Sequence, residues 1–188
     1  MPNLIVLAGC NGAGKTTLSK RLLPKFLEVK EFVNADEIAR GLSPYNPEGA
    51  SFAAGRIMLE RIRSLAVEQI DFAIETTLST KTYASLFLEL KERGYSIILI
   101  FVFLDSAEEA KTRVRKRVES GGHGISAEIV ERRYKRGTEN FKNIFMNLSD
   151  RFQVFDNTNA LPIFVAEKDE NGIIVYNQEI WNKIIDHE

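Results

Sequence analysis

The sequence has little cysteine, no excess of either charge and no long apolar run. Cys10 is the one cysteine, which excludes a disulfide within the chain and gives no sign of an oxidising compartment. No apolar run is long enough to span a bilayer. The apolar stretch near the N-terminus follows no basic leader, so we expect a buried strand there and not a signal peptide. These absences predict a cytoplasmic protein with no membrane partner.

The charges of the chain nearly cancel. There are 25 Lys and Arg residues against 26 Asp and Glu residues, for a net charge of −1. A dedicated DNA-coating protein should carry a basic excess, so this balance argues against a nucleic-acid partner. With 188 residues, 44% of them hydrophobic and 27% charged, the composition is typical of a globular protein. We expect one domain over residues 1–188, long enough to bury a core.

The balanced total hides an uneven distribution. Residues 111–136 hold nine basic side chains against three acidic ones, a local charge of +6, so the rest of the chain carries −7. A field of this size commonly faces an anion. A solvated helix face is the alternative, and charge alone favours it. Tyr134 is the one aromatic residue of the stretch, which argues against a platform that stacks nucleic-acid bases.

Apolar runs alternate with segments of helical periodicity, which predicts an α/β protein with a central, mainly parallel sheet. The pattern predicts five strands of this sheet, at 3–8, 31–34, 72–75, 96–104 and 151–156. It predicts flanking helices at 15–23, 35–42, 51–69, 81–93, 107–118 and 126–147. A small β-hairpin (162–167 with 172–176) and a short helix (179–185) should close the chain over about 160–188.

Residues 9–16, GCNGAGKT, fit the pattern G-x-x-x-x-G-K-[ST] between a buried strand and a helix. The glycines allow the backbone to curl, so that several N–H groups and the start of the helix point at one phosphate group. We expect Lys15 to reach the β- and γ-phosphates of ATP and Thr16 to ligate Mg²⁺. The residues assigned to ATP by this loop are Gly9, Asn11, Gly12, Ala13, Gly14, Lys15, Thr16 and Thr17. Cys10 either fills a variable position of the loop or is a reactive thiol.

Acidic residues lie at the ends of three of the predicted strands, where open α/β sheets build their sites. Asp36 follows the second strand and could align an acceptor hydroxyl and take its proton, or it could be an ordinary first-turn acid of a helix. Glu75 ends the third strand beside two threonines and is the candidate for the metal side or the acceptor side. Asp105 ends the fourth strand, but the helix-start pattern after it makes Glu75 the better metal candidate.

The basic stretch has the order helix, glycine-rich break, helix, which is how small kinases build a mobile lid over a phosphate. Arg113 and Arg117 lie four residues apart on the first helix, and therefore on one face. Arg132, Arg133 and Arg136 follow on the second helix. Arginine suits this place because its planar fork binds phosphate oxygens in pairs. We interpret 111–136 as a lid region, and His123 in the break as a loop residue and not a catalytic base.

These motifs together resemble the zeta-toxin-like P-loop kinases, and within them the short bacterial branch of ATPases. The residues that carry the resemblance are GCNGAGKT, Phe32-Val33-Asn34-Ala35-Asp36, Ile74-Glu75-Thr76-Thr77-Leu78-Ser79, the arginines before Gly121-Gly122-His123-Gly124, Arg132-Arg133-Tyr134 and Phe155-Asp156-Asn157-Thr158. They run from Ile5 to Thr158. The resemblance implies an adenylate-kinase-like sheet, and ATP with Mg²⁺ as donor for phosphoryl transfer to a hydroxyl.

The resemblance also implies roles for single residues. Asp36 matches the aspartate that activates the acceptor, and Glu75 and Thr77 match its acid and threonine on the acceptor side. Arg117, with Arg132 or Arg133, matches the arginines that contact the γ-phosphate and act in catalysis beside Lys15. Arg113 and Asn157 are further ATP-side candidates. Which arginine of the second lid helix reaches the γ-phosphate stays open.

The acceptor is not specified by these motifs. In the toxins of this group it is a UDP-N-acetylhexosamine, but they usually carry a basic residue where this chain has Ser79, and they have a longer C-terminal part. A small hydroxyl-bearing acceptor is expected, and neither toxicity nor an antitoxin partner follows from the sequence. The alternatives are a nucleoside or polynucleotide 5′-hydroxyl kinase, and a nucleotide switch or ATPase that is not a kinase.

Overall fold

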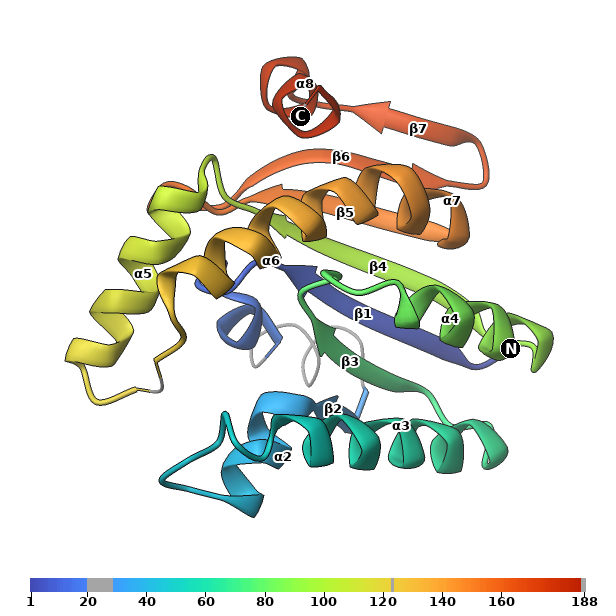
Figure 1. Cartoon of the computed structure of the whole chain (residues 1–188). Coiled ribbons are helices and arrows are strands. Elements are labelled where there is room, and N and C mark those ends of the chain that lie inside the picture. The colour runs from blue at the N-terminus through green and yellow to red at the C-terminus, as the bar shows by residue number, and fades with distance from the viewer. Residues whose placement is uncertain (20–28, 123, 187–188) are drawn as a thin grey trace.

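A computed structural model describes residues 1–19, 29–122 and 124–186 of the chain. Its centre is one sheet in the order β2-β3-β1-β4-β5-β6-β7 (Figure 1). The strands are β1 (Asn3–Gly9), β2 (Glu31–Asn34), β3 (Phe72–Thr76), β4 (Ser96–Phe103), β5 (Arg151–Asp156), β6 (Ile163–Asp169) and β7 (Gly172–Val175). The first five pair in parallel, which confirms the predicted α/β fold with a mainly parallel sheet.

The number of strands in the sheet corrects the prediction of five. The C-terminal hairpin forms as predicted, but β6 pairs antiparallel with β5 and so adds two strands to the edge of the same sheet. The register between β5 and β6 shifts at Val154 and Phe155, where a bulge bends the strands. Val165 and Ala166 of β6 are buried, so the hairpin belongs to the core and is no separate appendage.

The helices follow the predicted positions to within a few residues. They are α2 (Ala35–Leu42), α3 (Ser51–Val67), α4 (Thr82–Glu92), α5 (Ala107–Glu119), α6 (Ala127–Asn140), α7 (Met146–Leu148) and α8 (Gln178–Ile185). The predicted helix over 126–147 is interrupted by a π-helical turn, η1 (Phe141–Phe145), between α6 and α7. The helix predicted over 15–23 is present at 15–19, and the rest of it lies outside the described residues. No helix within the described ranges is both long and apolar enough to cross a bilayer.

The core explains why β1 and β4 occupy the centre of the sheet. Six of the seven residues of β1 are buried, the pattern of a strand covered on both faces. One face of the sheet packs against apolar side chains of α3, α4, α6 and η1, and Phe141 of η1 stacks on Phe101 of β4 with ring centroids 4.0 Å apart. At the far edge, Trp181 of α8 stacks on Phe152 of β5 at 6.2 Å.

Parallel pairing brings the ends of the strands to one edge. In the register of β2 and β3, Asn34 lies opposite Glu75, and in that of β1 and β3, Ala8 lies opposite Thr76. The phosphate loop leaves β1 at this edge, between the segments that follow β3 and β4. Figure 1 shows α5 and the start of α6 at the same end of the sheet. Ligands of open α/β sheets bind at this edge.

Candidate active site

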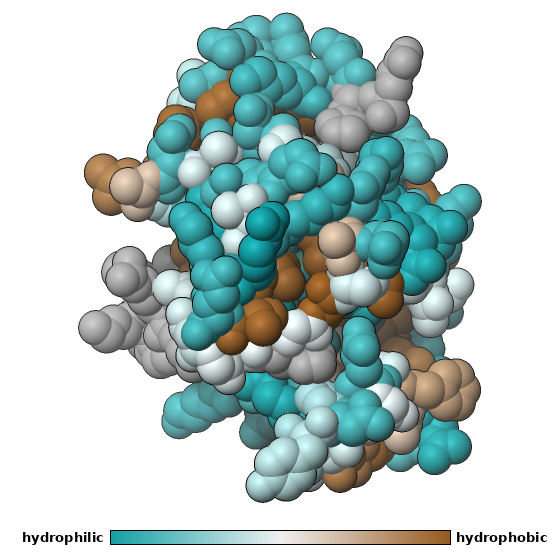
Figure 2. All heavy atoms as spheres, turned by 60° about the vertical axis from the view of Figure 1, so that its left-hand side comes forward, coloured by the Kyte–Doolittle hydropathy of each residue, from teal (hydrophilic) through white to brown (hydrophobic). Residues whose placement is uncertain are grey.

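A cavity of about 610 Å³ opens at the carboxyl edge of the sheet. Figure 2 looks at the molecule from nearer this side, and most side chains on that face are hydrophilic. The residues that line the cavity include Asn11, Gly12, Gly14, Lys15, Thr16, Thr17, Asp36, Arg40, Glu75, Thr77, Ser79, Arg113, Arg117 and Arg133. Residues predicted from five separate segments of the sequence therefore share one hollow.

The phosphate loop has a backbone that only glycine adopts without strain. Gly9 and Gly14 have φ values of 142° and 91°. A Cβ on Gly9 would lie 2.2 Å from the carbonyl oxygen of Val102, and one on Gly14 would lie 2.6 Å from Nδ2 of Asn157. The Asn157 amide donates to the carbonyl oxygen of Ala13 at 2.8 Å. Asn157 thus braces the loop from the end of β5, and it does not line the cavity.

Lys15 and Cys10 of the phosphate loop are both buried. The Lys15 side chain is buried, and its Nζ donates to the Cys10 carbonyl oxygen at 2.9 Å and lies 3.8 Å from Oε1 of Glu75. Burial raises the pKa of the Cys10 thiol to about 11, although the charge of Lys15 opposes this rise. The thiol is therefore protonated at neutral pH, which favours the interpretation that Cys10 only fills its position.

The Glu75 carboxylate contacts the side chains of Lys15, Thr16 and Asn34. It accepts a hydrogen bond from Oγ1 of Thr16 at 2.9 Å and one from Nδ2 of Asn34 at 3.1 Å. A hydroxyl and a carboxylate side by side offer hard oxygen ligands, which Mg²⁺ prefers, so these residues fit the predicted ion. The described residues contain no group of three or more His, Cys, Asp or Glu side chains that could hold a metal. A magnesium site here would therefore use Thr16, Glu75 and ligands from outside the chain.

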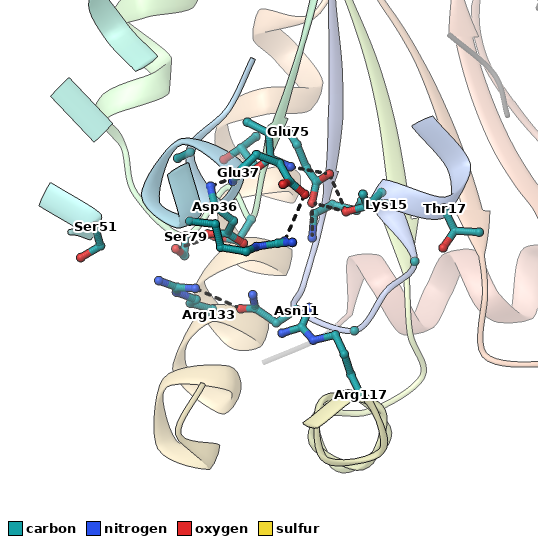
Figure 3. Close-up of a pocket in the computed structure, with 18 of the residues that line it drawn as sticks. Asn11, Lys15, Thr17, Asp36, Glu37, Ser51, Glu75, Ser79, Arg117 and Arg133 are labelled. Carbon is teal, nitrogen blue, oxygen red and sulfur yellow. Dashed lines mark hydrogen bonds and ion pairs between the residues drawn. The ribbon is translucent and has the colours of Figure 1, made fainter. Parts of the chain in front are cut away.

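Asp36 reaches the cavity because α2 begins directly after Asn34. The Asn34 side chain caps this helix, with Oδ1 accepting from the backbone N–H of Asp36 at 2.8 Å and of Glu37 at 3.4 Å. The cap places Asp36 in the first turn, where the helix dipole favours a carboxylate. Asp36 and Glu75 line the same cavity, and Figure 3 shows both of them near Lys15 and the phosphate loop. Asp36 is exposed to solvent, as a group that meets a diffusing acceptor must be.

Thr77 lies in a strained turn after β3. Leu78 has a φ of 54°, unusual for a residue other than glycine, and its carbonyl oxygen accepts from Nδ2 of the buried Asn140 at 2.7 Å. Gly137 of α6 packs so tightly that a Cβ on it would lie 2.4 Å from the Thr77 carbonyl oxygen. The Thr77 and Ser79 hydroxyls are 2.9 Å apart. The close approach of Gly137 and the hydrogen bond from the Asn140 side chain thus hold α6 and the turn together.

Some arginines of residues 111–136 line the cavity and others do not. Arg113 and Arg117 of α5 and Arg133 of α6 line the cavity, and Nη1 of Arg133 donates to Oδ1 of Asn11 on the phosphate loop at 3.3 Å. Arg113 also bonds Glu109 at 2.6 Å and the Thr158 carbonyl oxygen at 2.7 Å. Arg132, which the sequence left level with Arg133, is exposed and does not line the cavity. The geometry therefore favours Arg133 on the second helix of the lid region.

The rest of the basic stretch includes helix surface. Lys111 joins α5 to α6 through Glu131, at 2.7 Å. Hydrogen bonds from Lys111 and Lys135 hold the pKa of Glu131 at about 2, so this pairing persists down to acidic pH. Some basic side chains of residues 111–136 therefore belong to a solvated helix surface, and others, Arg113, Arg117 and Arg133, line the cavity.

One further predicted position, Asp105, lies away from the cavity. The Asp105 carboxylate lies 3.1 Å from Nζ of Lys183 on α8, so it joins the end of β4 to the last helix and is not beside Thr16. His123 lies outside the described residues. Sequence reasoning also missed contributors: the dual contacts of Asn34, the support from Gly137 and Asn140, and Arg40, Ser51 and Tyr83 in the lining. An asparagine directly before a helix signals an N-cap, but the bond from Asn34 to Glu75 crosses between two strands.

The fold is that of P-loop kinases. A shikimate kinase from Acinetobacter baumannii in complex with shikimate superposes with a TM-score of 0.52 at 14% identity, over 85% of this chain and 86% of that one. The PezAT toxin–antitoxin system of Streptococcus pneumoniae contains a similar chain, with a TM-score of 0.70, 18% identity, and coverage of 100% and 80%. The predicted resemblance to zeta-toxin-like kinases is thereby confirmed at the level of the fold.

A structure of AvrRxo1-ORF1 and AvrRxo1-ORF2 with ATP gives a TM-score of 0.79 at 18% identity. It matches 98% of this chain, which spans 64% of the length of that one. A family model described as AAA domain matches residues 4–144, so the chain belongs to that family. An uncharacterized protein of Haemophilus influenzae is 32% identical over 130 residues, which are 69% of this chain and 91% of the relative.

Proposed function

We propose that this chain is an ATP-dependent phosphotransferase that moves the γ-phosphoryl group of ATP to a hydroxyl of a small-molecule acceptor. The observation that carries the proposal is one cavity lined by a phosphate loop, by the Thr16–Glu75 pair, by Asp36 and by the arginines of α5 and α6, Arg113, Arg117 and Arg133. A nucleotide switch needs the phosphate loop. It does not need a solvent-exposed aspartate across the cavity from that loop.

On the donor side, the backbone N–H groups of the phosphate loop and Nζ of Lys15 would hold the β- and γ-phosphates. Thr16 and Glu75 would hold Mg²⁺, which when bound neutralises phosphate charge and orients the oxygens. Lys15 and Thr16 already meet at the Glu75 carboxylate, so both are held near their working positions by one partner. Asn157 keeps the loop in shape from behind.

On the acceptor side, Asp36 would align the hydroxyl for in-line attack. The acceptor oxygen forms a bond to the γ-phosphorus, the bond from that phosphorus to the β,γ-bridging oxygen breaks, and ADP leaves. The hydroxyl proton passes to the Asp36 carboxylate. Arg117 and Arg133, one from each helix of the lid region, would neutralise the charge that spreads over the transferring group.

The direct test is to incubate a metabolite extract with ATP and the full chain and to analyse it by mass spectrometry. A compound heavier by one phosphate should appear with the wild type and be absent with Lys15→Ala. Asp36→Asn should also lose the product while it still binds ATP, because its side chain is far less basic but similar in shape. A slow ATP hydrolysis that no extract accelerates would instead indicate a switch, and transfer by Asp36→Asn would refute the assigned base.

A further inference from the structure

Arg133 lies where two hollows of the molecule meet. It lines the cavity at the phosphate loop, and it also lines a second hollow of about 150 Å³, bounded by residues of α2, α3 and α6. Asp36 is likewise common to the two linings. Figure 3 shows Arg133 on the side of Asp36, Ser51 and Ser79. A phosphoryl group that moves from ATP to a hydroxyl at Asp36 would therefore pass this guanidinium.

The contact that holds Arg133 leaves its charge intact. Among the described residues no ion pair joins it to a carboxylate, and its Nη1 donates to Oδ1 of Asn11 at 3.3 Å. Figure 3 shows this bond between α6 and the phosphate loop. Arg113, by contrast, lies 2.6 Å from the carboxylate of Glu109. A neutral amide orients a cation without offsetting its charge, so Arg133 keeps that charge for an anionic ligand.

Asn11 is a buried amide at a position where the phosphate-loop pattern accepts any residue. It is the third residue of G-x-x-x-x-G-K-[ST], and 4% of it is exposed. Burying a polar side chain costs free energy unless the side chain is hydrogen-bonded, and the bond from Arg133 satisfies the Asn11 oxygen. The contact with Arg133 therefore gives a reason for an asparagine here that the pattern does not give.

The backbone is held in place at each end of this contact. The phosphate loop packs against α5, where a Cβ on Gly12 would lie 3.0 Å from the Ala110 carbonyl oxygen. On α6, the Tyr134 hydroxyl donates to the Leu104 carbonyl oxygen at 2.9 Å. The arginine side chain between them has many rotamers, and a hydrogen bond to a fixed partner favours those that reach the phosphate loop.

We propose that Asn11 is a positioning residue for phosphoryl transfer, whose amide oxygen holds the charged guanidinium of Arg133 between the phosphate loop and Asp36. This inference rests on the proposed function and adds a residue to it. Asn11 acts through Arg133, which meets the charge that develops on the transferring group. Such preorganisation favours the transition state over bound ATP, so its loss should lower the rate at saturating ATP and leave the ATP requirement nearly unchanged.

The test measures label transferred by the full chain from γ-labelled ATP to compounds of a metabolite extract, at varied ATP and a fixed amount of extract. Asn11→Ala should lower the rate at saturating ATP by about tenfold, because it removes a hydrogen bond to a charged group. The ATP concentration for half-maximal rate should change little. An unchanged saturated rate, or a change in the ATP requirement alone, would overturn the inference and leave the proposed kinase intact. No label with the wild type would remove both.

A double-mutant cycle tests whether the effect of Asn11 passes through Arg133. In an Arg133→Ala background, Asn11→Ala should cause no further loss of rate. Asn157→Ala is the matched control, because Asn157 contacts the same loop through the Ala13 carbonyl oxygen and not through Arg133. Its effect should be the same in both backgrounds. Additive losses for Asn11→Ala and Arg133→Ala would contradict the positioning role.

Asn11→Asp provides a measurement that does not depend on the folding of the alanine variant. Aspartate has nearly the shape of asparagine and can still accept from Arg133, but its charge offsets that of the guanidinium beside the phosphates. Thermal unfolding should therefore resemble that of the wild type, while transfer at saturating ATP falls by about tenfold. Wild-type transfer by Asn11→Asp would show that the charge left on Arg133 by a neutral partner has no role, and would refute the inference.

Discussion

At the scale of the residue, Asn34 is the side chain with the most consequences for the site. It is buried, its amide donates to Glu75, and its oxygen caps the helix that carries Asp36. One side chain therefore fixes Glu75, the proposed metal-side acid, and Asp36, the proposed base, relative to each other. Asn34 contacts no reacting atom in the proposed mechanism, so it is a positioning residue.

Replacing Asn34 with serine separates these contacts. Serine is also a good N-cap, so the fold should lose no more than about 1 kcal/mol from the cap. The shorter side chain cannot donate to Glu75, so phosphoryl transfer should fall and the Mg²⁺ concentration for half-maximal rate should rise. Thermal unfolding and a Mg²⁺ titration measure the two effects.

Asn46→Ser provides the control for this change. Asn46 is exposed, and its Oδ1 accepts from the backbone N–H of Gly49 in the loop before α3. The same substitution there removes a local contact without touching Glu75. If Asn34→Ser matched this control in both rate and Mg²⁺ requirement, the positioning role would be wrong.

Residues of the site differ in how far the sequence predicts them. Asp36 and Glu75 were predictable because each lies at the carboxyl end of a strand of a parallel sheet, and such strands end at one edge. The choice between Arg132 and Arg133 could not be predicted from the sequence. Neighbours on a helix point about 100° apart, and the direction that faces the cavity depends on packing. Here Tyr134 is buried and bonds the Leu104 carbonyl oxygen, which fixes the rotation of α6.

At the scale of the element, α6 and the turn after β3 behave as one unit. Gly137 lets the helix approach the Thr77 carbonyl oxygen, and Asn140 holds the next carbonyl of that turn. The π-helical turn that follows brings Phe141 onto β4. Such turns are frequent at functional sites, and here it lets one helix serve both the core and the cavity.

Two glycines in helices should therefore respond to alanine with opposite signs. Gly137→Ala introduces a Cβ 2.4 Å from a backbone oxygen and should destabilise the protein by about 1–3 kcal/mol, as overpacking does. Gly55→Ala in α3 meets no atom within 4 Å and should stabilise by roughly 0.5–1 kcal/mol, because alanine is the better helix former. Denaturant unfolding gives both values. Equal effects would mean that α6 moves freely against the turn.

The periodicity of the sequence predicts the bounds of some helices and strands and not of others. Strands β2 and β5 have the predicted bounds, since apolar runs between polar turns locate them. The break at η1 has no such signal, because a π-helical turn keeps the apolar residues of a helix. The hairpin was predicted as a pair, but which strand it would join depends on the exposed edge of β5, a property of the assembled sheet.

At the scale of the whole molecule, the C-terminal hairpin and α8 are joined to the parallel sheet by Trp181 and Phe152. Ile184 of the same helix is fully buried. Contacts of this kind predict a single cooperative unit across the described chain. The sequence-based expectation of one domain over residues 1–188 makes the same prediction.

The single tryptophan makes this testable without any substitution. The fluorescence of Trp181 reports on α8, and far-ultraviolet circular dichroism reports on all the helices and strands. The two denaturant transitions should coincide, as they do when one domain unfolds in a two-state manner. A tryptophan transition at clearly lower denaturant would show that the C-terminal part unfolds by itself.

The strand order has a consequence for how the chain is made. Strand β1 is the first element in the sequence, yet it lies in the middle of the sheet between β3 and β4. Its apolar residues have no neighbouring strand until residues 72–76 and 96–103 have been synthesised. Non-local pairing of this kind is slow, and unpaired strand edges aggregate. We therefore expect the nascent chain to rely on chaperones until β4 has left the ribosome.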